Sequence, residues 1–286
     1  MKIRVYKEYG ALNSKPVFEA FEKGVLVNRD TLVDSYEDAD CVVIWSVLFQ
    51  GRMAANQAIW ERANADNKPV VVLEIGTLVR NQTWRVGING INRDAQFNEY
   101  WDIGSQRRNM LQLSLDPWQD DSKEFITIAT QRPDSLQWVG MPSVEDWLKT
   151  TIDQIKEVSK RPIVIRPHPR DKITNFNLVA KQNENVYFDI PQSIGVADSV
   201  NFKDILERTH VLVNYCTSPA IEAVMRGVPV MVGPPSMAWE MNTEVENIEN
   251  PNKPDRDIWF DRICHTEWTV DEIGVGEPWS RLRVLV

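Results

Sequence analysis

Three short segments place proton-transferring or anion-binding side chains directly after apolar runs. Glu74 lies near the end of PVVVLEIG, His168 follows RPIVIRP, and Thr217 and Ser218 follow VLVNYC. A carboxylate can take a proton from a hydroxyl, and an imidazole can give one to a departing phosphate oxygen. Hydroxyls beside a helix start can bind phosphate. These residue types fit the transfer of a group from a phosphate to a hydroxyl.

The segment VNYCTSPAIEAVMRGVPVMVG (213–233) predicts a strand, a helix and a second strand. Ser218 can cap the helix, Pro219 suits its first position because proline has no N–H to leave unpaired, and Gly227 ends it. The helix start would then lie at the carboxyl end of a strand, where it can bind phosphate. An ordinary helix cap with a first-turn acid is the alternative. The predicted phosphate- and ribose-binding residues are Thr217, Ser218, Pro219, Ala220 and Glu222.

The segment RPIVIRPHPRD (161–171) ends a predicted strand in cationic side chains. Two prolines stiffen the backbone that carries Arg166, His168 and Arg170, and rigid cations suit a pyrophosphate. The chain has only three histidines, and His210 and His265 lack neighbours at metal-ligand spacing, so no metal site is predicted.

The segment between Arg80 and Arg108 combines arginines with aromatic residues. Arginine can bind phosphates, and aromatic rings can stack on an extruded base, so the segment suggests a loop that handles nucleic acid. A glycan acceptor would stack on the same rings, and a loop that packs on its own domain is the third possibility. The predicted acceptor-binding residues are Arg80, Trp84, Arg85, Arg93 and Trp101.

Apolar runs alternate with helical patterns along most of the chain, which predicts parallel sheets in α/β domains. Ligands are then expected at the carboxyl ends of strands. We expect an N-terminal Rossmann-like domain (1–120), a C-terminal Rossmann-like domain (121–286) and a cleft between them. After residue 240 no regular pattern remains. The predicted strands are 2–9, 41–46, 69–76, 124–130, 161–167, 186–190, 211–216 and 228–233, and the predicted helices are 16–23, 52–66, 201–208 and one from Ser143.

Composition restricts the class of protein. A chain of 286 residues with 43% hydrophobic residues is long enough for two cores. We expect a cytoplasmic protein, because neither a membrane span nor a signal peptide is evident. Cys41, Cys216 and Cys264 are widely spaced and predict reduced thiols. The net charge of -9 disfavours non-specific coating of nucleic acid but allows a local basic groove.

Taken together, three motifs resemble those of a known group of enzymes. Glu74-Ile75-Gly76, His168-Pro169 and Thr217-Ser218 resemble the acidic-Gly, His-Pro and Ser-Ser/Thr motifs of bacterial sialyltransferases and capsule polysaccharide (Kdo-type) transferases, which have the GT-B fold. The strand, helix and strand of 213–233 are similar to the donor-binding unit of GT-B glycosyltransferases. One departure is Ile75, where the family commonly has a second acid.

The resemblance implies roles for individual residues. Glu74 would be the base, His168 and the Thr217-Ser218 pair would contact the donor phosphate, and Glu222 would hold the ribose. The substrate would be a UDP- or CMP-linked sugar, with no further cofactor. The short chain also resembles phage enzymes that glycosylate hydroxymethylated DNA bases.

The sequence therefore predicts a glycosyltransferase, with a hydroxymethylated pyrimidine in phage DNA as the preferred acceptor. The alternatives are a transferase acting on a capsule or lipopolysaccharide glycan, a nucleotide-sugar epimerase of similar fold, and a non-catalytic binding protein. A dehydrogenase is disfavoured because no G-x-G-x-x-G follows the first strand. The sugar, the stereochemistry of transfer and the oligomeric state stay open.

Overall fold

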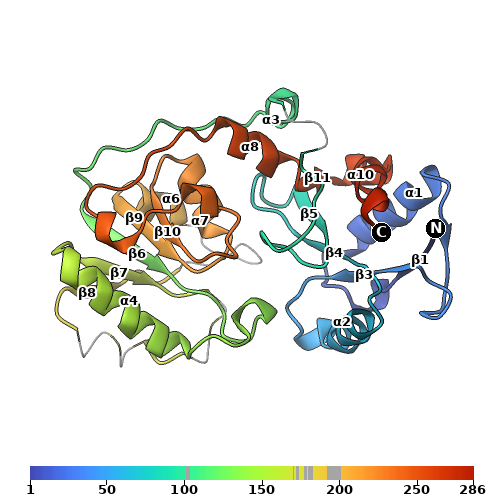
Figure 1. Cartoon of the computed structure of the whole chain (residues 1–286), viewed down its shortest axis with the longest axis horizontal. Helices are drawn as coiled ribbons and strands as arrows, with labels where there is room; N and C mark the ends of the chain where they lie inside the picture. The colour runs from blue at the N-terminus through green and yellow to red at the C-terminus, as the bar shows by residue number, and fades with distance from the viewer. Residues whose placement is uncertain (101–103, 170, 172–173, 177–178, 180–182, 192–200) are drawn as a thin grey trace. The chain divides into compact units, whose positions relative to one another are not determined.

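The chain folds as two α/β units (Figure 1). Unit 1 comprises Met1–Leu113 together with Asp257–Val286, and unit 2 comprises Ser114–Arg256. The computed structural model describes the whole chain except residues 101–103, 170, 172–173, 177–178, 180–182 and 192–200.

Unit 1 is built on a six-stranded sheet with the order β11-β5-β4-β3-β1-β2. Strands β1 to β4 pair in parallel, whereas β5 runs antiparallel to β4 and β11 runs antiparallel to β5. Because β2 and β3 flank β1 on opposite sides, the strand order reverses between β1 and β3. The strands are β1 (Lys2–Val5), β2 (Thr31–Leu32), β3 (Cys41–Trp45), β4 (Val70–Ile75), β5 (Thr83–Ile88) and β11 (Glu267–Thr269).

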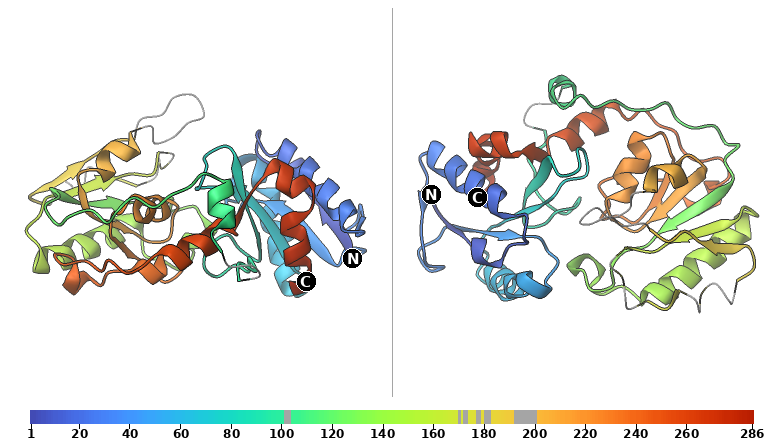
Figure 2. Two further views of the ribbon diagram at one scale, coloured as in Figure 1. Left: turned by 90° about the horizontal axis from the view of Figure 1, so that it is seen from above. Right: turned by 180° about the vertical axis from the view of Figure 1, so that it is seen from behind.

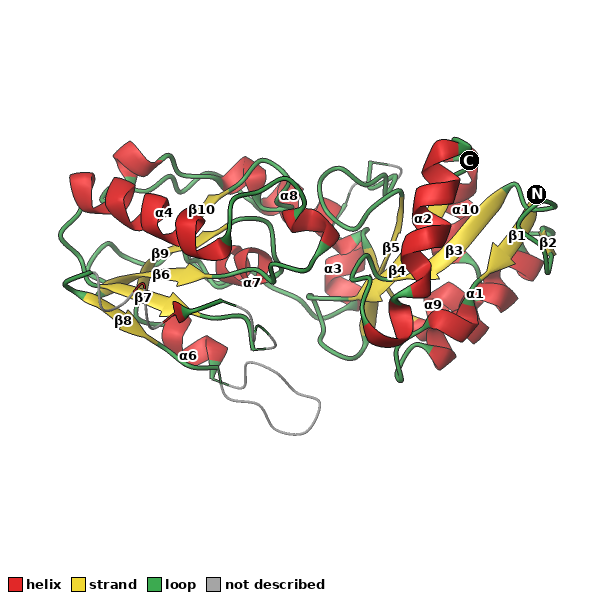
Figure 3. Cartoon of the chain, turned by 90° about the horizontal axis from the view of Figure 1, so that it is seen from below, coloured by secondary structure: helices red, strands yellow, loops and turns green. Residues whose placement is uncertain are grey.

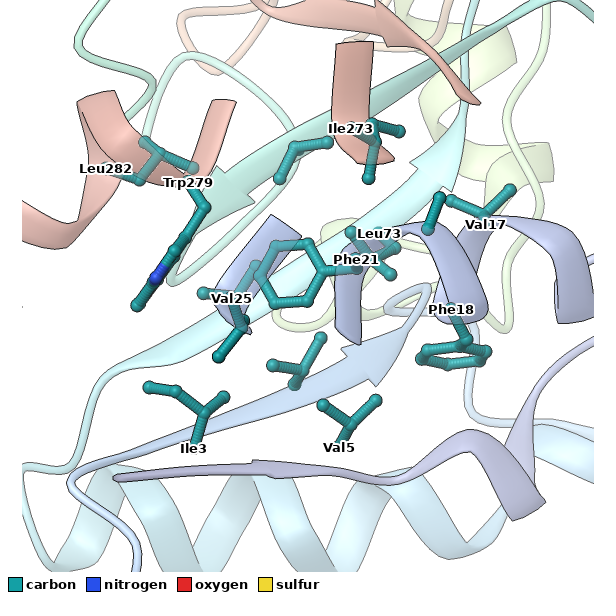
Figure 4. Close-up of a cluster of buried hydrophobic side chains, with 14 of the residues drawn as sticks. Ile3, Val5, Val17, Phe18, Phe21, Val25, Leu73, Ile273, Trp279 and Leu282 are labelled. Carbon is teal, nitrogen blue, oxygen red and sulfur yellow. The ribbon is translucent and has the colours of Figure 1, made fainter. Parts of the chain in front are cut away.

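Alternating side chains of these strands form the core of unit 1. Ile3 and Val5 of β1 and Leu73 of β4 pack against Phe18 and Phe21 of α1 (Figure 4). Helices α9 and α10 complete this layer, and α2 lies on the other face of the sheet (Figure 1). The helices of unit 1 are α1 (Lys15–Val27), α2 (Ala55–Ala65), α3 (Gln106–Met110), α8 (Asp257–Cys264), α9 (Val270–Gly274) and α10 (Glu277–Leu282).

Unit 2 is built on a five-stranded parallel sheet with the order β10-β9-β6-β7-β8. The order reverses between β6 and β9. Helix α4 covers one face and α6 the other (Figure 3). The elements are β6 (Phe125–Ala129), α4 (Val144–Val158), β7 (Ile163–Arg166), β8 (Val186–Phe188), α6 (Phe202–Leu206), β9 (Thr209–Asn214), α7 (Pro219–Met225) and β10 (Val230–Val232).

Short 3-10 turns connect several of these elements. They are η1 (Lys7–Tyr9), η2 (Gly51–Met53), η3 (Leu136–Trp138), η4 (Trp239–Met241), η5 (Val245–Asn247) and η6 (Arg283–Leu285). Helix α4 starts as its sequence indicates, because the Ser143 hydroxyl accepts a hydrogen bond from the Asp146 N–H at 3.1 Å. Its buried face contains Leu148, Ile152 and Ile155.

The C-terminal segment 257–286 belongs to unit 1, whereas the sequence placed it in the second domain. Strand β11 extends the first sheet by pairing with β5, with Trp268 opposite Trp84. Both chain ends lie in unit 1 (Figure 2), where Asp30 binds the N-terminal amino group and Arg283. Periodicity could not place this segment, because its pairing partners are far away in the sequence.

Glu267 of β11 is a fully buried carboxylate with several donors. It accepts hydrogen bonds from the backbone N–H groups of Thr77 and Leu78, at 2.8 and 2.9 Å, and from the Thr83 hydroxyl at 2.9 Å. It also forms a 3.0 Å ion pair with buried Arg85. The carboxylate therefore holds both the C-terminal segment and the loop that follows β4.

Replacing Glu267 with Ala should destabilise unit 1 by about 3–5 kcal/mol, because it leaves the Arg85 charge and two backbone donors buried without their acceptor. Urea denaturation of the whole chain measures the loss. Glu19→Ala is the control, since it removes an exposed carboxylate whose 3.7 Å pair with Lys15 should be worth at most about 0.5 kcal/mol. Equal effects of the two changes would contradict this role of Glu267.

Candidate active site

The point where the strand order reverses in unit 2 is where ligands bind in open α/β sheets. Strands β6, β7 and β9 are parallel neighbours, so the loops that follow them emerge at the same edge of the sheet. These loops carry Thr130 after β6, His168 after β7, and Thr217 with Ser218 after β9. The structure therefore brings the His-Pro and Thr-Ser motifs to one edge.

Asn214, the last residue of β9, joins two of these loops. Its side chain is buried, and its amide nitrogen donates to the Ala129 carbonyl at 2.9 Å and to the Thr217 hydroxyl oxygen at 2.5 Å. Its amide oxygen accepts the Thr217 N–H at 2.8 Å. Because Asn214 donates to the Thr217 oxygen, the hydroxyl proton of Thr217 is left to donate elsewhere. Asn214 was not among the predicted site residues, although a single amide side chain in an apolar strand indicates a buried hydrogen-bonding role.

The start of α7 differs in detail from the expectation. Ser218 occupies the N-cap position, but its side chain makes no capping hydrogen bond. The N–H of Thr217 is bound to Asn214, Pro219 has none, and the N–H of Ala220 donates to the Thr217 carbonyl at 3.3 Å. Fewer backbone donors are thus available than expected, and the Thr217 and Ser218 hydroxyls become the main candidates for phosphate contact.

Glu222 lies one turn into α7 and is partly exposed. One of its carboxylate oxygens forms a 3.0 Å ion pair with Arg226 in the next turn. The pair is a common helical one and leaves the other oxygen as an acceptor. A role in holding ribose stays a prediction.

Neither Arg166 nor Arg170, both predicted to bind the donor phosphate, can be placed in the candidate site. Arg166 is buried and forms an ion pair with Asp189 and a 2.9 Å hydrogen bond with Asn201. These contacts commit its guanidinium to joining β7 with the segment after β8, so we leave Arg166 out of the candidate site. Arg170 lies outside the described residues.

His168 and Arg132 supply the basic side chains of the edge. The backbone N–H of His168 donates to the Thr130 hydroxyl at 3.1 Å, which fixes the loop after β7 against the loop after β6. Arg132, two residues after Thr130, binds Asp134 through two hydrogen bonds of 2.8 and 2.6 Å. Sequence reasoning missed Arg132, because it belongs to no motif.

In unit 1, Glu74 lies at the carboxyl end of β4. Its carboxylate accepts the Ser46 hydroxyl at 2.5 Å and the N–H of Ile75 at 2.8 Å. Arg85 on the neighbouring strand does not form an ion pair with Glu74, because its guanidinium is paired with Glu267. Burial raises the pKa of Glu74, and the hydrogen bonds from Ser46 and Ile75 oppose this rise. A carboxylate with an increased proton affinity suits a general base.

Close packing explains why the acidic-Gly motif has a glycine at position 76. A Cβ atom at this position would lie 2.4 Å from a Glu267 carboxylate oxygen and 2.4 Å from the Thr83 carbonyl oxygen. Only glycine lets the chain turn over Glu267 at this distance. The glycine thus belongs to the loop that Glu267 holds.

The predicted acceptor-binding residues do not form one exposed surface. Arg80 and Arg93 are exposed, whereas Arg85 is buried and Trp84 packs partly buried against the core of unit 1. Trp101 lies outside the described residues. In the same segment, Arg107 is bound to Glu272, and Arg108 to Asp257 and Asp261.

Within the described residues, no group of three or more His, Cys, Asp or Glu side chains could hold a metal ion. Cys41, Cys216 and Cys264 are buried free thiols, and burial raises the pKa of Cys41 and of Cys264 to about 12. None of the described helices has the length and apolar composition needed to span a bilayer.

The pH dependence of stability should report on Glu74. Since burial raises its folded-state pKa, the carboxyl contributes stability while protonated, at pH below its unfolded pKa, and this contribution is lost as pH rises through the folded pKa. Glu74→Gln mimics the protonated acid, so its free energy of unfolding relative to the wild type should increase between pH 4 and pH 8. Urea denaturation at both pH values measures this. Exposed Glu61→Gln controls for the lost charge, and an equal trend in both variants would contradict the assignment.

Comparisons with known proteins identify the architecture. No protein-family model matches the chain, and no curated protein is recognisably similar in sequence. Among solved structures, the Thermosulfurimonas dismutans KpsC β-Kdo 2,7 transferase is similar with a TM-score of 0.52 and 15% identity, over 99% of this chain and 100% of that chain.

Two further structures align at lower scores. The T. dismutans KpsC β-Kdo 2,4 transferase has a TM-score of 0.49 and 13% identity over 93% of this chain and 90% of its own. The Methanocaldococcus jannaschii UDP-GlcNAc 2-epimerase has a TM-score of 0.35 and 12% identity over 100% and 99%. The alignment with the 2,7 transferase extends over both units. The chain has a GT-B-like fold of two Rossmann-like units, which confirms the fold implied by the three sequence motifs.

Proposed function

We propose that this protein is a glycosyltransferase that moves a sugar from a nucleotide-sugar donor to an acceptor hydroxyl. The observation that carries the proposal is the Glu74 carboxylate, held at a strand end of unit 1 in a GT-B-like fold and with a raised pKa. The polar edge of unit 2 supports it, because the loops that carry His168 and the Thr217 hydroxyl emerge where the strand order reverses.

In this mechanism the donor binds to unit 2. Its phosphate oxygens accept hydrogen bonds from the Thr217 and Ser218 hydroxyls, and His168 donates to the leaving oxygen. The bond between the sugar and this oxygen breaks through an oxocarbenium-like state. Glu74 takes the proton of the acceptor hydroxyl, whose oxygen forms the new bond to the sugar. Donors aimed at the leaving phosphate stabilise the charge that develops there.

Two classes of acceptor fit an enzyme that deprotonates a hydroxyl. They are a hydroxymethylated pyrimidine in DNA and a glycan. The arginine-rich segment was the support for DNA, and its Arg85, Arg107 and Arg108 are now paired with acids. The similar KpsC structure is a β-Kdo 2,7 transferase, so Kdo is among the sugars to be tested.

The proposal is tested by incubating the protein with UDP- and CMP-linked sugars, including a CMP-linked Kdo, and with both classes of acceptor. We expect release of the nucleotide and a mass increase of one acceptor by one sugar residue. Mass spectrometry detects the product. A changed sugar in the absence of any acceptor would identify an epimerase instead, and donor binding without any turnover would identify a binding protein. Acceptor binding that weakens steeply with salt would favour DNA over a glycan.

Two substitutions separate the proposed roles. Glu74→Gln should lower turnover by a factor of about 10²–10⁴ while donor binding, measured by calorimetry, stays unchanged, because the base does not contact the donor phosphate. His168→Ala should lower turnover by a factor of about 10², because the leaving oxygen loses its donor. Glu61→Gln is the control for both. Unchanged turnover in either variant removes that residue from the mechanism.

A further inference from the structure

Ser46 is the residue that follows β3, beside Glu74 on the neighbouring strand. We propose that Ser46 is a positioning residue that orients the Glu74 carboxylate and keeps it ready to accept a proton. This inference rests on the proposed function, since it assigns a partner to the base of that reaction. No motif in the sequence contains Ser46.

The backbone of Ser46 has an unusual conformation. Its φ of 62° lies in the left-handed region, where residues other than glycine are uncommon and strained. Its N–H donates to the Leu73 carbonyl at 2.8 Å, so the chain turns while still attached to β4, one residue before Glu74. Ser46 is also buried. Strain of this kind persists where the surrounding structure holds it in place, and here it places a hydroxyl against a carboxylate.

Two hydrogen bonds of the Ser46 hydroxyl determine that its proton points to the Glu74 carboxylate. Its oxygen accepts the Leu48 N–H at 3.1 Å, and its proton goes to a Glu74 carboxylate oxygen at 2.5 Å. The second carboxylate oxygen of Glu74 accepts the Ile75 N–H. One donor on each oxygen limits rotation of the carboxylate. When Glu74 takes up a proton, the hydroxyl can accept from it, because a hydroxyl both donates and accepts.

The arginines near Glu74 influence its carboxylate less than the Ser46 hydroxyl does. Arg85 lies opposite Glu74 on β5, but its guanidinium is ion-paired with Glu267. Arg80 lies in the loop after β4 and is exposed, so solvent screens its charge. Both arginines lower the pKa of Glu74 less than the Ser46 hydrogen bond does, and burial acts against all of them. Without the hydroxyl, Glu74 should therefore hold its proton to a higher pH.

Two substitutions remove the hydroxyl with opposite effects on the backbone. Ser46→Ala keeps a strained Cβ at positive φ, whereas Ser46→Gly relieves the strain. Ser35→Ala is a matched control in the same unit, because Ser35 donates to the Asp38 carboxylate at 2.7 Å on the exposed surface. A purely structural role of Ser46 would make the Ala and Gly variants differ, whereas a role in positioning Glu74 makes them behave alike.

The first measurement needs no turnover. Carbon-13 NMR of glutamate-labelled protein follows the Glu74 carboxyl through a pH titration, with Glu74→Gln assigning its signal. We expect the midpoint for Glu74 to move to higher pH in both Ser46 variants and to stay unchanged in Ser35→Ala. An unchanged midpoint in folded Ser46→Gly overturns the inference.

The second measurement is the pH profile of kcat/KM with the donor and acceptor found for the wild type. In both Ser46 variants kcat/KM at pH 6 should fall by about 10- to 100-fold, the loss expected for a hydrogen bond to a charged group. The loss should shrink towards pH 9, with the KM of the donor unchanged. A loss that is equal at all pH values overturns the inference. If the midpoint moves but Glu74→Gln keeps full turnover, the Ser46–Glu74 coupling stands and the proposed function fails.

Discussion

The buried Glu267 carboxylate is the interaction on which the candidate base depends. Thr77, Leu78 and Thr83 donate to it, and Arg85 neutralises its charge. A buried carboxylate is stable only when its charge is paired and its oxygens have donors, so the loop after β4 has to run close to β11. The position of Glu74, three residues before Thr77, therefore depends on a strand near the end of the chain.

Two carboxylates of unit 1, Glu267 and Glu74, show how the surroundings separate a structural role from the catalytic role that we propose. Glu267 has an arginine partner and three further donors, which fix its position in the fold. Glu74 has one hydroxyl and one backbone N–H, and burial raises its pKa. The same residue type thus anchors the fold at one position and, in the proposed reaction, accepts a proton at the other, where it lacks an arginine partner.

The sequence was sufficient where local periodicity decides the structure. Helix α4 with its Ser143 cap, the parallel strands, and the placement of His168 and Thr217 at one edge follow from local patterns. It was insufficient where a partner is distant. Arg85 was predicted to bind the acceptor because nothing near it in the sequence indicates its ion pair with Glu267. The contact of Arg166 with Asp189 could not be predicted for the same reason. The segment 257–286 was assigned to the second domain, because no local pattern indicates that its strand β11 pairs with β5 of the first sheet.

In each unit, a polar residue outside the motifs holds a motif residue in position. Asn214 orients the Thr217 hydroxyl in unit 2, and Ser46 orients the Glu74 carboxylate in unit 1. In each case the supporting side chain is buried, and the motif residue that it holds is partly exposed. A group that reacts must face its substrate, so its precision has to come from a neighbour that does not. In the proposed reaction the motif residues carry the chemistry, and the buried amide of Asn214 and hydroxyl of Ser46 hold them in position.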